Sequence, residues 1–293
     1  MLIDNKTAKG AIFLIISAFC FALMGLFVQL SGDLPSLQKA FFRNIVAAIA
    51  AFAVLLKEGG GFKWQKGSLP YLILRTLFGT LGLLCNFYAL DHMILSDALI
   101  LNKLSPFFVI ILSFFVLKEK VTPFQLSMVV MGFLGSLFVI KPTPELLNPA
   151  SIVGLIGGFG AGAAYTMVRK LSEFNERKSY IVFFFSALSC LILLPGQIIN
   201  HADMTLIQFI YLILAGVSAA LGQFAITAAY SYAPARDISV YDYTQVVFST
   251  LMSLIVFGTV PDSLSVIGYI IIFGATVIMF IMNKKQDDFF LEI

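Results

Sequence analysis

Residues 10–30 read GAIFLIISAFCFALMGLFVQL, a run of 21 residues without a charged side chain. A helix rises about 1.5 Å per residue, so about 20 apolar residues cross the roughly 30 Å hydrocarbon core of a membrane. Continuous apolar runs, rather than alternation of apolar and polar residues, favour helices over the strands of a barrel. The ten predicted spans are 10–30, 37–56, 70–90, 97–117, 123–140, 151–170, 179–197, 206–230, 237–257 and 263–282.

The composition agrees with a chain that faces lipid. Hydrophobic residues make up 59% of the 293 residues and charged residues 12%, whereas a soluble domain carries about 25% charged residues. A soluble fold of this size has too little interior for so much apolar surface. A soluble enzyme, a nucleic-acid-binding protein and a disordered chain are therefore excluded, and we expect an all-α integral membrane protein.

The distribution of Lys and Arg predicts the orientation of the chain. Cytoplasmic connections are enriched in these residues. With both termini in the cytoplasm, 14 of the 19 basic residues lie on the inner side. We therefore predict a multi-pass protein of the cytoplasmic (plasma) membrane with cytoplasmic N- and C-termini.

A faint internal repeat divides the chain into two halves, residues 1–142 and residues 143–293. An offset of 139–141 residues places Gly135 on Gly274, Ala89 on Ala228 and Ser31 on Ser172, and the spacing of the spans agrees. Five spans per half is an odd number, so the second half enters the membrane from the opposite side. The chain is thus predicted to be a 5+5 inverted-topology repeat, an architecture of many secondary transporters.

The sequence resembles the drug/metabolite transporter superfamily, and in particular its EamA-type members with ten helices. The residues that carry the resemblance are Phe41–Asn44, Leu74–Thr76, Asn102–Pro106, Leu117–Gln125, Gly132, Gly135 and Lys141–Pro142. The second half departs from the family pattern, because Gly258 replaces a frequent Glu and Gln245 stands where Pro106 stands in the first half. The family transports chemically diverse solutes, so the resemblance implies a transporter without naming a substrate.

Two ionisable residues inside the spans are the first candidates for a substrate site. A charged group at the bilayer centre costs at least about 2.5–3.5 kcal/mol and usually faces a partner or a watery cavity. Lys103, beside Asn102 and the helix-breaking Pro106, is interpreted as a substrate-facing cation or as a side chain that extends to the interface. Asp242 occupies the position that matches Lys103. It is interpreted as a substrate contact, a proton carrier or a gate partner, or as a hydrated carboxylate near the interface.

Two arginines also lie within spans. Arg43 could bind an anionic group, tie helices together or reach a lipid phosphate. Arg75 lies about five residues from the cytoplasmic end of its span, and we expect it to extend to the interface. An excess of cations over acids within the spans favours an anionic or zwitterionic solute.

Neutral residues complete the candidate substrate site. Buried amides must find a hydrogen bond, either with the substrate or with another helix. Aromatic rings serve equally as cavity walls or as packing. These candidates are Asn86, Gln223, Tyr165, Phe21, Tyr241 and Gln245.

The remaining motifs limit the chemistry. Gly154, Gly158 and Gly162 form successive G-x-x-x-G steps that predict close helix packing. No ATP-binding, metal-binding or catalytic motif is found, so we expect no enzyme activity, cofactor or metal. The predicted function is secondary-active transport of a small polar or amphipathic metabolite by alternating access, proton-coupled or by exchange. The alternative is a flippase for a lipid or lipid-linked carrier. The expected partners are the solute and membrane lipid, with no nucleic acid, in a monomer or homodimer.

Overall fold

A computed structural model of the chain describes residues 6–59, 61–92, 95–144, 149–258 and 260–291. Within these residues the regular structure is helical, without strands. Ten helical segments there are long and apolar enough to cross a membrane, which confirms the predicted spans. The elements are α1 (Lys6–Leu30), α2 (Ser36–Glu58), α3 (Leu69–His92), α4 (Leu95–Asn102), α5 (Ser105–Leu117), α6 (Pro123–Ile140), α7 (Pro149–Glu173), α8 (Lys178–Ile199), α9 (Leu206–Tyr232), α10 (Ala235–Ile238), the 3₁₀ turn η2 (Ser239–Tyr243), α11 (Thr244–Phe257) and α12 (Ser263–Leu291).

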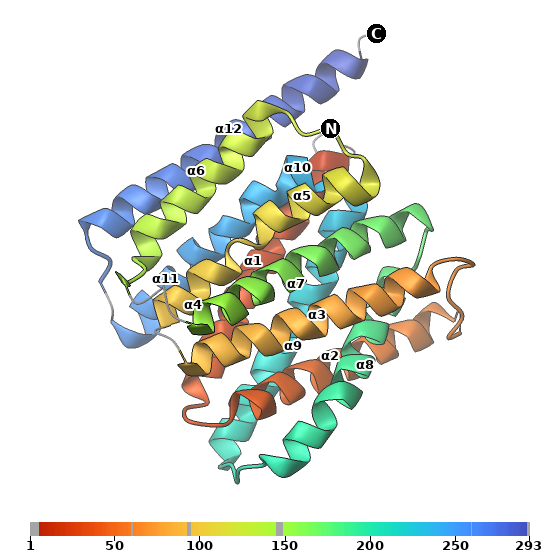
Figure 1. Ribbon diagram of the computed structural model, residues 1–293, viewed down its shortest axis with the longest axis vertical. Coiled ribbons are helices and arrows are strands. Elements are labelled where there is room, and N and C mark those ends of the chain that lie inside the picture. Colours follow the sequence, from red (N-terminus) through yellow and green to blue (C-terminus); the bar gives the residue numbers. More distant parts are fainter. Residues whose placement is uncertain (1–5, 60, 93–94, 145–148, 259, 292–293) are drawn as a thin grey trace.

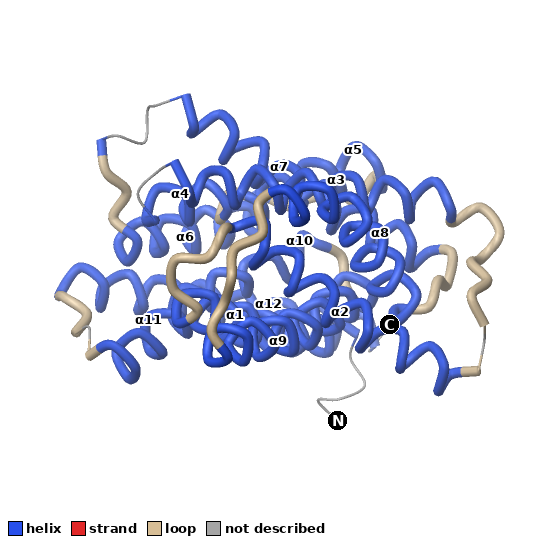
Figure 2. The backbone as a smooth tube through the Cα atoms, turned by 90° about the horizontal axis from the view of Figure 1, so that it is seen from below, coloured by secondary structure: helices blue, strands red, loops and turns tan. Residues whose placement is uncertain are grey.

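The helices form two layers (Figure 2). In one layer α7 packs between α3 and the α4–α5 pair, and in the other α1 packs between α9 and α11. Helices α2 and α8 pair at one end of the molecule, and α6 and α12 pair at the other (Figure 1). Each layer therefore contains helices from both halves of the sequence.

The packing pattern has two-fold pseudo-symmetry. The pairing of α1 with α9 matches the pairing of α7 with α3, and α1 on α11 matches α7 on α5. The α2–α8 and α6–α12 pairs each join a helix to its own counterpart. This arrangement is the one expected for two five-span repeats of opposite orientation.

Helix ends repeat as well. Helix α5 is followed by the capping residue Lys118 with φ 57°, and α11 is followed by the capping residue Gly258 with φ 68°. Both residues are in the left-handed conformation, which closes a helix by binding its last carbonyl groups. Helix ends at matching positions therefore persist although one uses lysine and the other glycine.

The glycines of α7 allow close helix contact, as predicted. A Cβ atom on Gly158 would lie 2.5 Å from the carbonyl oxygen of Leu101, and one on Gly162 would lie 3.0 Å from that of Ser105. These glycines bring α7 against the end of α4 and the start of α5. They thereby fix the position of the segment that carries Lys103.

Candidate functional site

The fourth span is broken at Lys103. Helix α4 ends at Asn102 and α5 begins at Ser105. Pro106 has no N–H group, so the carbonyl of Asn102 has no donor four residues later. The N–H groups of Leu104 and Phe107 donate to carbonyls three residues back, which tightens the chain around the break. The predicted helix break at Pro106 is therefore present, and Lys103 lies in it.

The ninth span is broken at the corresponding place, which we did not predict. Four residues of α10 lead into the 3₁₀ turn η2, and α11 begins at Thr244. Asp242 lies in this turn. The breaks in the fourth and ninth spans therefore place Lys103 and Asp242 at equivalent positions of the two repeats.

Lys103 and Asp242 form an ion pair. The Lys103 Nζ atom donates to the Asp242 carboxylate at 2.8 Å, to the Asp242 carbonyl oxygen at 3.2 Å and to Gln245 Oε1 at 2.7 Å. An ammonium group has three N–H donors, so these acceptors satisfy all of them. Lys103 is only 5% exposed. Its side chain therefore does not extend to the membrane interface. Of the other candidates for the substrate site, Lys103 contacts Asp242 and Gln245.

Tyrosines surround this ion pair. Tyr241 and Tyr243 are buried, and among the described residues their hydroxyl groups have no hydrogen-bond partner. The ring of Tyr165 stacks on that of Tyr230, with centroids 5.4 Å apart. The hydroxyl of Tyr165 also lies within electrostatic range of Asp242. Tyr165 therefore belongs to the surroundings of the ion pair, and Tyr241 precedes Asp242 in the same turn.

Arg75 is buried rather than interfacial, so our expectation for it was wrong. It is 2% exposed. Its guanidinium donates to Gln223 Oε1 at 3.0 Å and lies 4.0 Å from the centroid of the Phe185 ring. The stacked ring and the amide acceptor stabilise the cation inside the bundle. The sequence analysis did not include Arg75 in the candidate substrate site. Gln223, which it did include, accepts the hydrogen bond from Arg75.

Arg43 lies nearby with neutral partners. Its Nε donates to the sulfur of Met24 at 3.2 Å, and its guanidinium carbon is 6.0 Å from the centroid of the Phe21 ring. The Phe21 ring in turn packs against Gly222 of α9. Phe21 therefore forms part of the wall beside Arg43.

Two candidates stand apart from these contacts. Asn102 and Asn86 are half-buried, and both lie where α7 packs closely, on Gly158 and Gly157 respectively. Neither side chain makes a hydrogen bond within the described part of the chain. Asn86 and Gln223, expected at similar depths, are not brought together.

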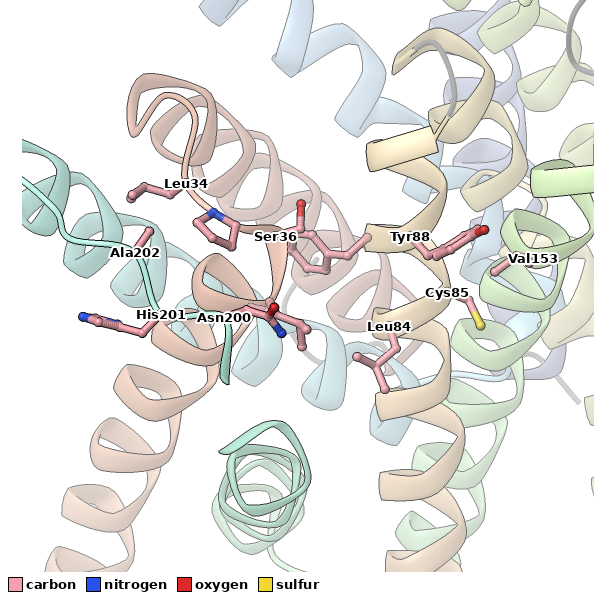
Figure 3. A pocket seen from close by; sticks show the side chains of 13 residues that line it. Leu34, Ser36, Leu84, Cys85, Tyr88, Val153, Asn200, His201 and Ala202 are labelled. Carbon is pink, nitrogen blue, oxygen red and sulfur yellow. The ribbon is translucent and has the colours of Figure 1, made fainter. Parts of the chain in front are cut away.

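A cleft opens at one face of the molecule. It has a volume of about 810 Å³. Figure 3 shows side chains of the α1–α2 and α8–α9 connections on one side and side chains of α3 on the other. Its lining residues are Leu34, Pro35, Ser36, Leu37, Ala40, Leu84, Cys85, Phe87, Tyr88, Val153, Asn200, His201 and Ala202.

Polar contacts tie the helix ends together at the opposite face. Glu176, between α7 and α8, accepts hydrogen bonds from the Ser68 hydroxyl at 2.6 Å and from the Gln65 N–H at 2.8 Å. Glu119, after α5, pairs with Arg169 of α7 at 3.0 Å. We call these two sets the closed-face contacts. The structure is thus open at one face and held together at the other.

Comparisons with known proteins agree with the fold and with transport. One solved crystal structure superposes with a TM-score of 0.82 at 15% identity, covering 93% of this chain and 98% of that one. The pseudopaline exporter CntI of Pseudomonas aeruginosa is 30% identical over 92% of this chain and 95% of its own. The riboflavin transporter of Vibrio cholerae is 26% identical over 89% of each chain. The S-adenosylmethionine uptake transporter of Rickettsia bellii is 25% identical over 87% of each.

The family assignment covers nearly the whole chain. The family model described as the EamA-like transporter family matches twice, at residues 8–141 and 148–281. The two matches each include five of the predicted spans. The chain is therefore a member of the EamA-like transporter family, within the drug/metabolite transporter superfamily.

Proposed function

We propose that the protein is a secondary-active transporter that moves a small polar or amphipathic metabolite across the cytoplasmic membrane by alternating access. The observation that carries this proposal is the Lys103–Asp242 ion pair. It lies where both repeats are broken, with a cleft at one face and the closed-face contacts at the other. Inverted repeats can exchange conformations, so a state of similar energy would open the closed face and close the cleft.

The distribution of charge supports an orientation. The closed-face connections carry most of the basic residues, so both termini and this face belong in the cytoplasm. The cleft then opens to the outside. The related transporters include an exporter and an uptake transporter, so the direction of transport follows from the gradients rather than from the family.

Asp242 is the candidate for proton coupling. No nucleotide-binding motif is present in the sequence, so the energy source is an ion or solute gradient. Protonation of the Asp242 carboxylate would remove the charge that holds Lys103 and free the ammonium group for the solute. A proton on Asp242 and a solute on Lys103 would then bind together, which is the basis of proton-coupled symport.

Reconstitution in liposomes tests the proposal. Purified protein is assayed for uptake of a metabolite library with and without a pH gradient, and we expect at least one solute to accumulate only when the gradient is imposed. Asp242→Asn should abolish accumulation, and Lys170→Gln, a surface variant whose native partner is Glu173, should not. Movement of fluorescent lipid between leaflets, without movement of any soluble compound, would favour the flippase alternative and contradict the proposal.

A further inference from the structure

Two buried guanidinium groups lack a negative partner. Arg43 is 7% exposed and Arg75 is 2% exposed. Within the described residues, neither arginine has a carboxylate within salt-bridge distance, and the Nε of Arg75 has no hydrogen-bond partner. Their partners are a thioether, an amide and two aromatic rings. Buried charges in proteins are normally paired, because transfer of an unpaired ion from water is unfavourable.

The two arginines are also close enough to repel each other. Arg43 lies within electrostatic range of Arg75, and both lie within range of the Tyr165 hydroxyl. That hydroxyl makes no hydrogen bond with the described residues. Asp242 carries the nearby negative charge, and it is already paired with Lys103. This part of the bundle therefore holds two positive charges that no side chain in it neutralises.

The cleft and these cations share the helices α2 and α3. Ala40 lines the cleft, and Arg43 follows it by three residues on α2, about one helical turn deeper. Leu84 and Cys85 line the cleft from α3, and Arg75 lies on the same helix roughly 14 Å further in. A solute that enters the cleft would therefore approach Arg43 first and Arg75 next.

We infer that Arg43 and Arg75, with the Tyr165 hydroxyl, form an oxyanion-binding subsite for the transported solute, and that the substrate carries a carboxylate or a similar anionic group. This inference rests on the proposed transport function and names its substrate class. A guanidinium group binds an oxyanion with two parallel N–H donors, and such charge-assisted bonds are the strong ones. The rings of Phe21 and Phe185 lie against Arg43 and Arg75. They would also suit an apolar part of the solute.

If the arginines had a purely structural role, we would expect a different set of hydrogen-bond partners around them. Residues kept for helix packing would be saturated by acceptors, whereas Arg75 keeps an unpaired N–H donor and Arg43 has no oxygen acceptor among the described residues. The phosphate of a lipid headgroup is also an oxyanion and could bind the same two arginines. The experiment must therefore distinguish a soluble anion from a lipid.

Thermal unfolding in neutral detergent tests the subsite without requiring transport. Probes are used in pairs at constant ionic strength, succinate against succinamide and benzoate against benzamide, together with inorganic phosphate. A ligand that binds only the folded state raises Tm as its concentration exceeds Kd. We expect at least one anion, and not its neutral amide, to raise Tm. A positive result stands even if no solute is transported, so it is separable from the outcome of the reconstitution experiment.

Variants locate the binding. Arg43→Gln and Arg75→Gln should each raise the apparent Kd of that anion at least about tenfold, which is the loss of about one charge-assisted bond. Arg43→Lys and Arg75→Lys keep the charge without the two-pronged donor geometry, and serve if the glutamine variants do not fold. We expect them to bind the anion more weakly than the wild type. Lys170→Gln removes a surface cation and should leave the apparent Kd unchanged.

Four results would overturn the inference. The first is that no anion raises Tm more than its amide. The second is an apparent Kd that is unchanged in all four arginine variants. The third is an equal loss in Lys170→Gln, which would indicate a general effect of net charge. Stabilisation by micelles that contain phosphatidylglycerol but by no soluble anion would also overturn it, because the oxyanion would then be a lipid phosphate rather than a solute.

Discussion

The Nζ atom of Lys103 lies 2.8 Å from the carboxylate of Asp242, and the two residues are 139 positions apart in the sequence. That separation is the period of the internal repeat, so a residue and its own counterpart meet across the pseudo-two-fold axis. Two identical ionised residues at such positions would repel each other at close range. The two repeats have therefore diverged to opposite charges where they meet, while retaining the same broken-helix geometry.

Removing one charge of this pair should be more harmful than removing both. Lys103→Gln or Asp242→Asn alone leaves a buried ion without its partner, which destabilises a protein by about 3–5 kcal/mol. We expect a large decrease of Tm in each single variant and loss of transport. The measurement is thermal unfolding in detergent combined with liposome uptake.

The double variant Lys103→Gln/Asp242→Asn provides the control. It removes the unpaired charge, so its Tm should recover toward that of the wild type, whereas transport should remain absent. A double variant whose loss of stability equals the sum of the two single losses would show that the pair is not coupled energetically.

Cys85 should report the open cleft. It lines the cleft, whereas Cys20 and Cys190 are buried. A membrane-impermeant maleimide applied to intact cells should label one cysteine per chain in the wild type and none in Cys85→Ser. Labelling of Cys85 only in inverted membrane vesicles would reverse the proposed orientation.

Glu176 should control the balance between open and closed faces. Its carboxylate accepts hydrogen bonds from Ser68 and Gln65, and a hydrogen bond to a charged group contributes about 1.5–3 kcal/mol. Glu176→Ala should therefore shift the population toward a state in which this face is open and the cleft is closed. The expected result is a several-fold lower rate of maleimide labelling at Cys85.

Glu173→Ala is the matched control for this experiment. Glu173 makes an exposed contact with Lys170 one turn earlier on the same helix, and such surface pairs contribute about 0–1 kcal/mol. The labelling rate of this variant should equal that of the wild type. An unchanged rate in Glu176→Ala as well would show that the contact does not influence the equilibrium.

The sequence predicted the membrane spans well, because each span is a local pattern of apolar residues. It also predicted the break at Pro106, which results from a missing N–H group in one residue. The break in the ninth span has no proline, and we missed it. Ser239, Asp242 and Thr244 were the available signal, since such side chains compete with the backbone for hydrogen bonds inside a helix.

Arg75 shows why a linear distance to a helix end is a poor guide to burial. Its position near the end of the third span suggested the interface, but it shares a helix face with Gly79 and Gly82. A face of small residues predicts contact with other helices. In the structure Gly82 lies against α7, and Arg75 lies against Phe185 of α8 and Gln223 of α9. The partners Gln223 and Phe185 come from distant parts of the chain, and no local pattern could identify them.

Gly160 should be a glycine of α7 whose replacement damages helix packing. A Cβ atom on it would lie 2.8 Å from the Gly82 Cα and N atoms and from the Phe78 carbonyl oxygen. These are backbone atoms, so no side chain can move aside, and Gly160→Ala should lower the free energy of unfolding by about 1–3 kcal/mol. Gly274→Ala is the control, because nothing lies within 4 Å of a Cβ atom there, and a helical Gly-to-Ala change is favourable by up to about 1 kcal/mol. Comparison of the two Tm values in the same detergent tests the prediction. Equal Tm changes would mean that α3 and α7 are not in close contact at Gly82 and Gly160.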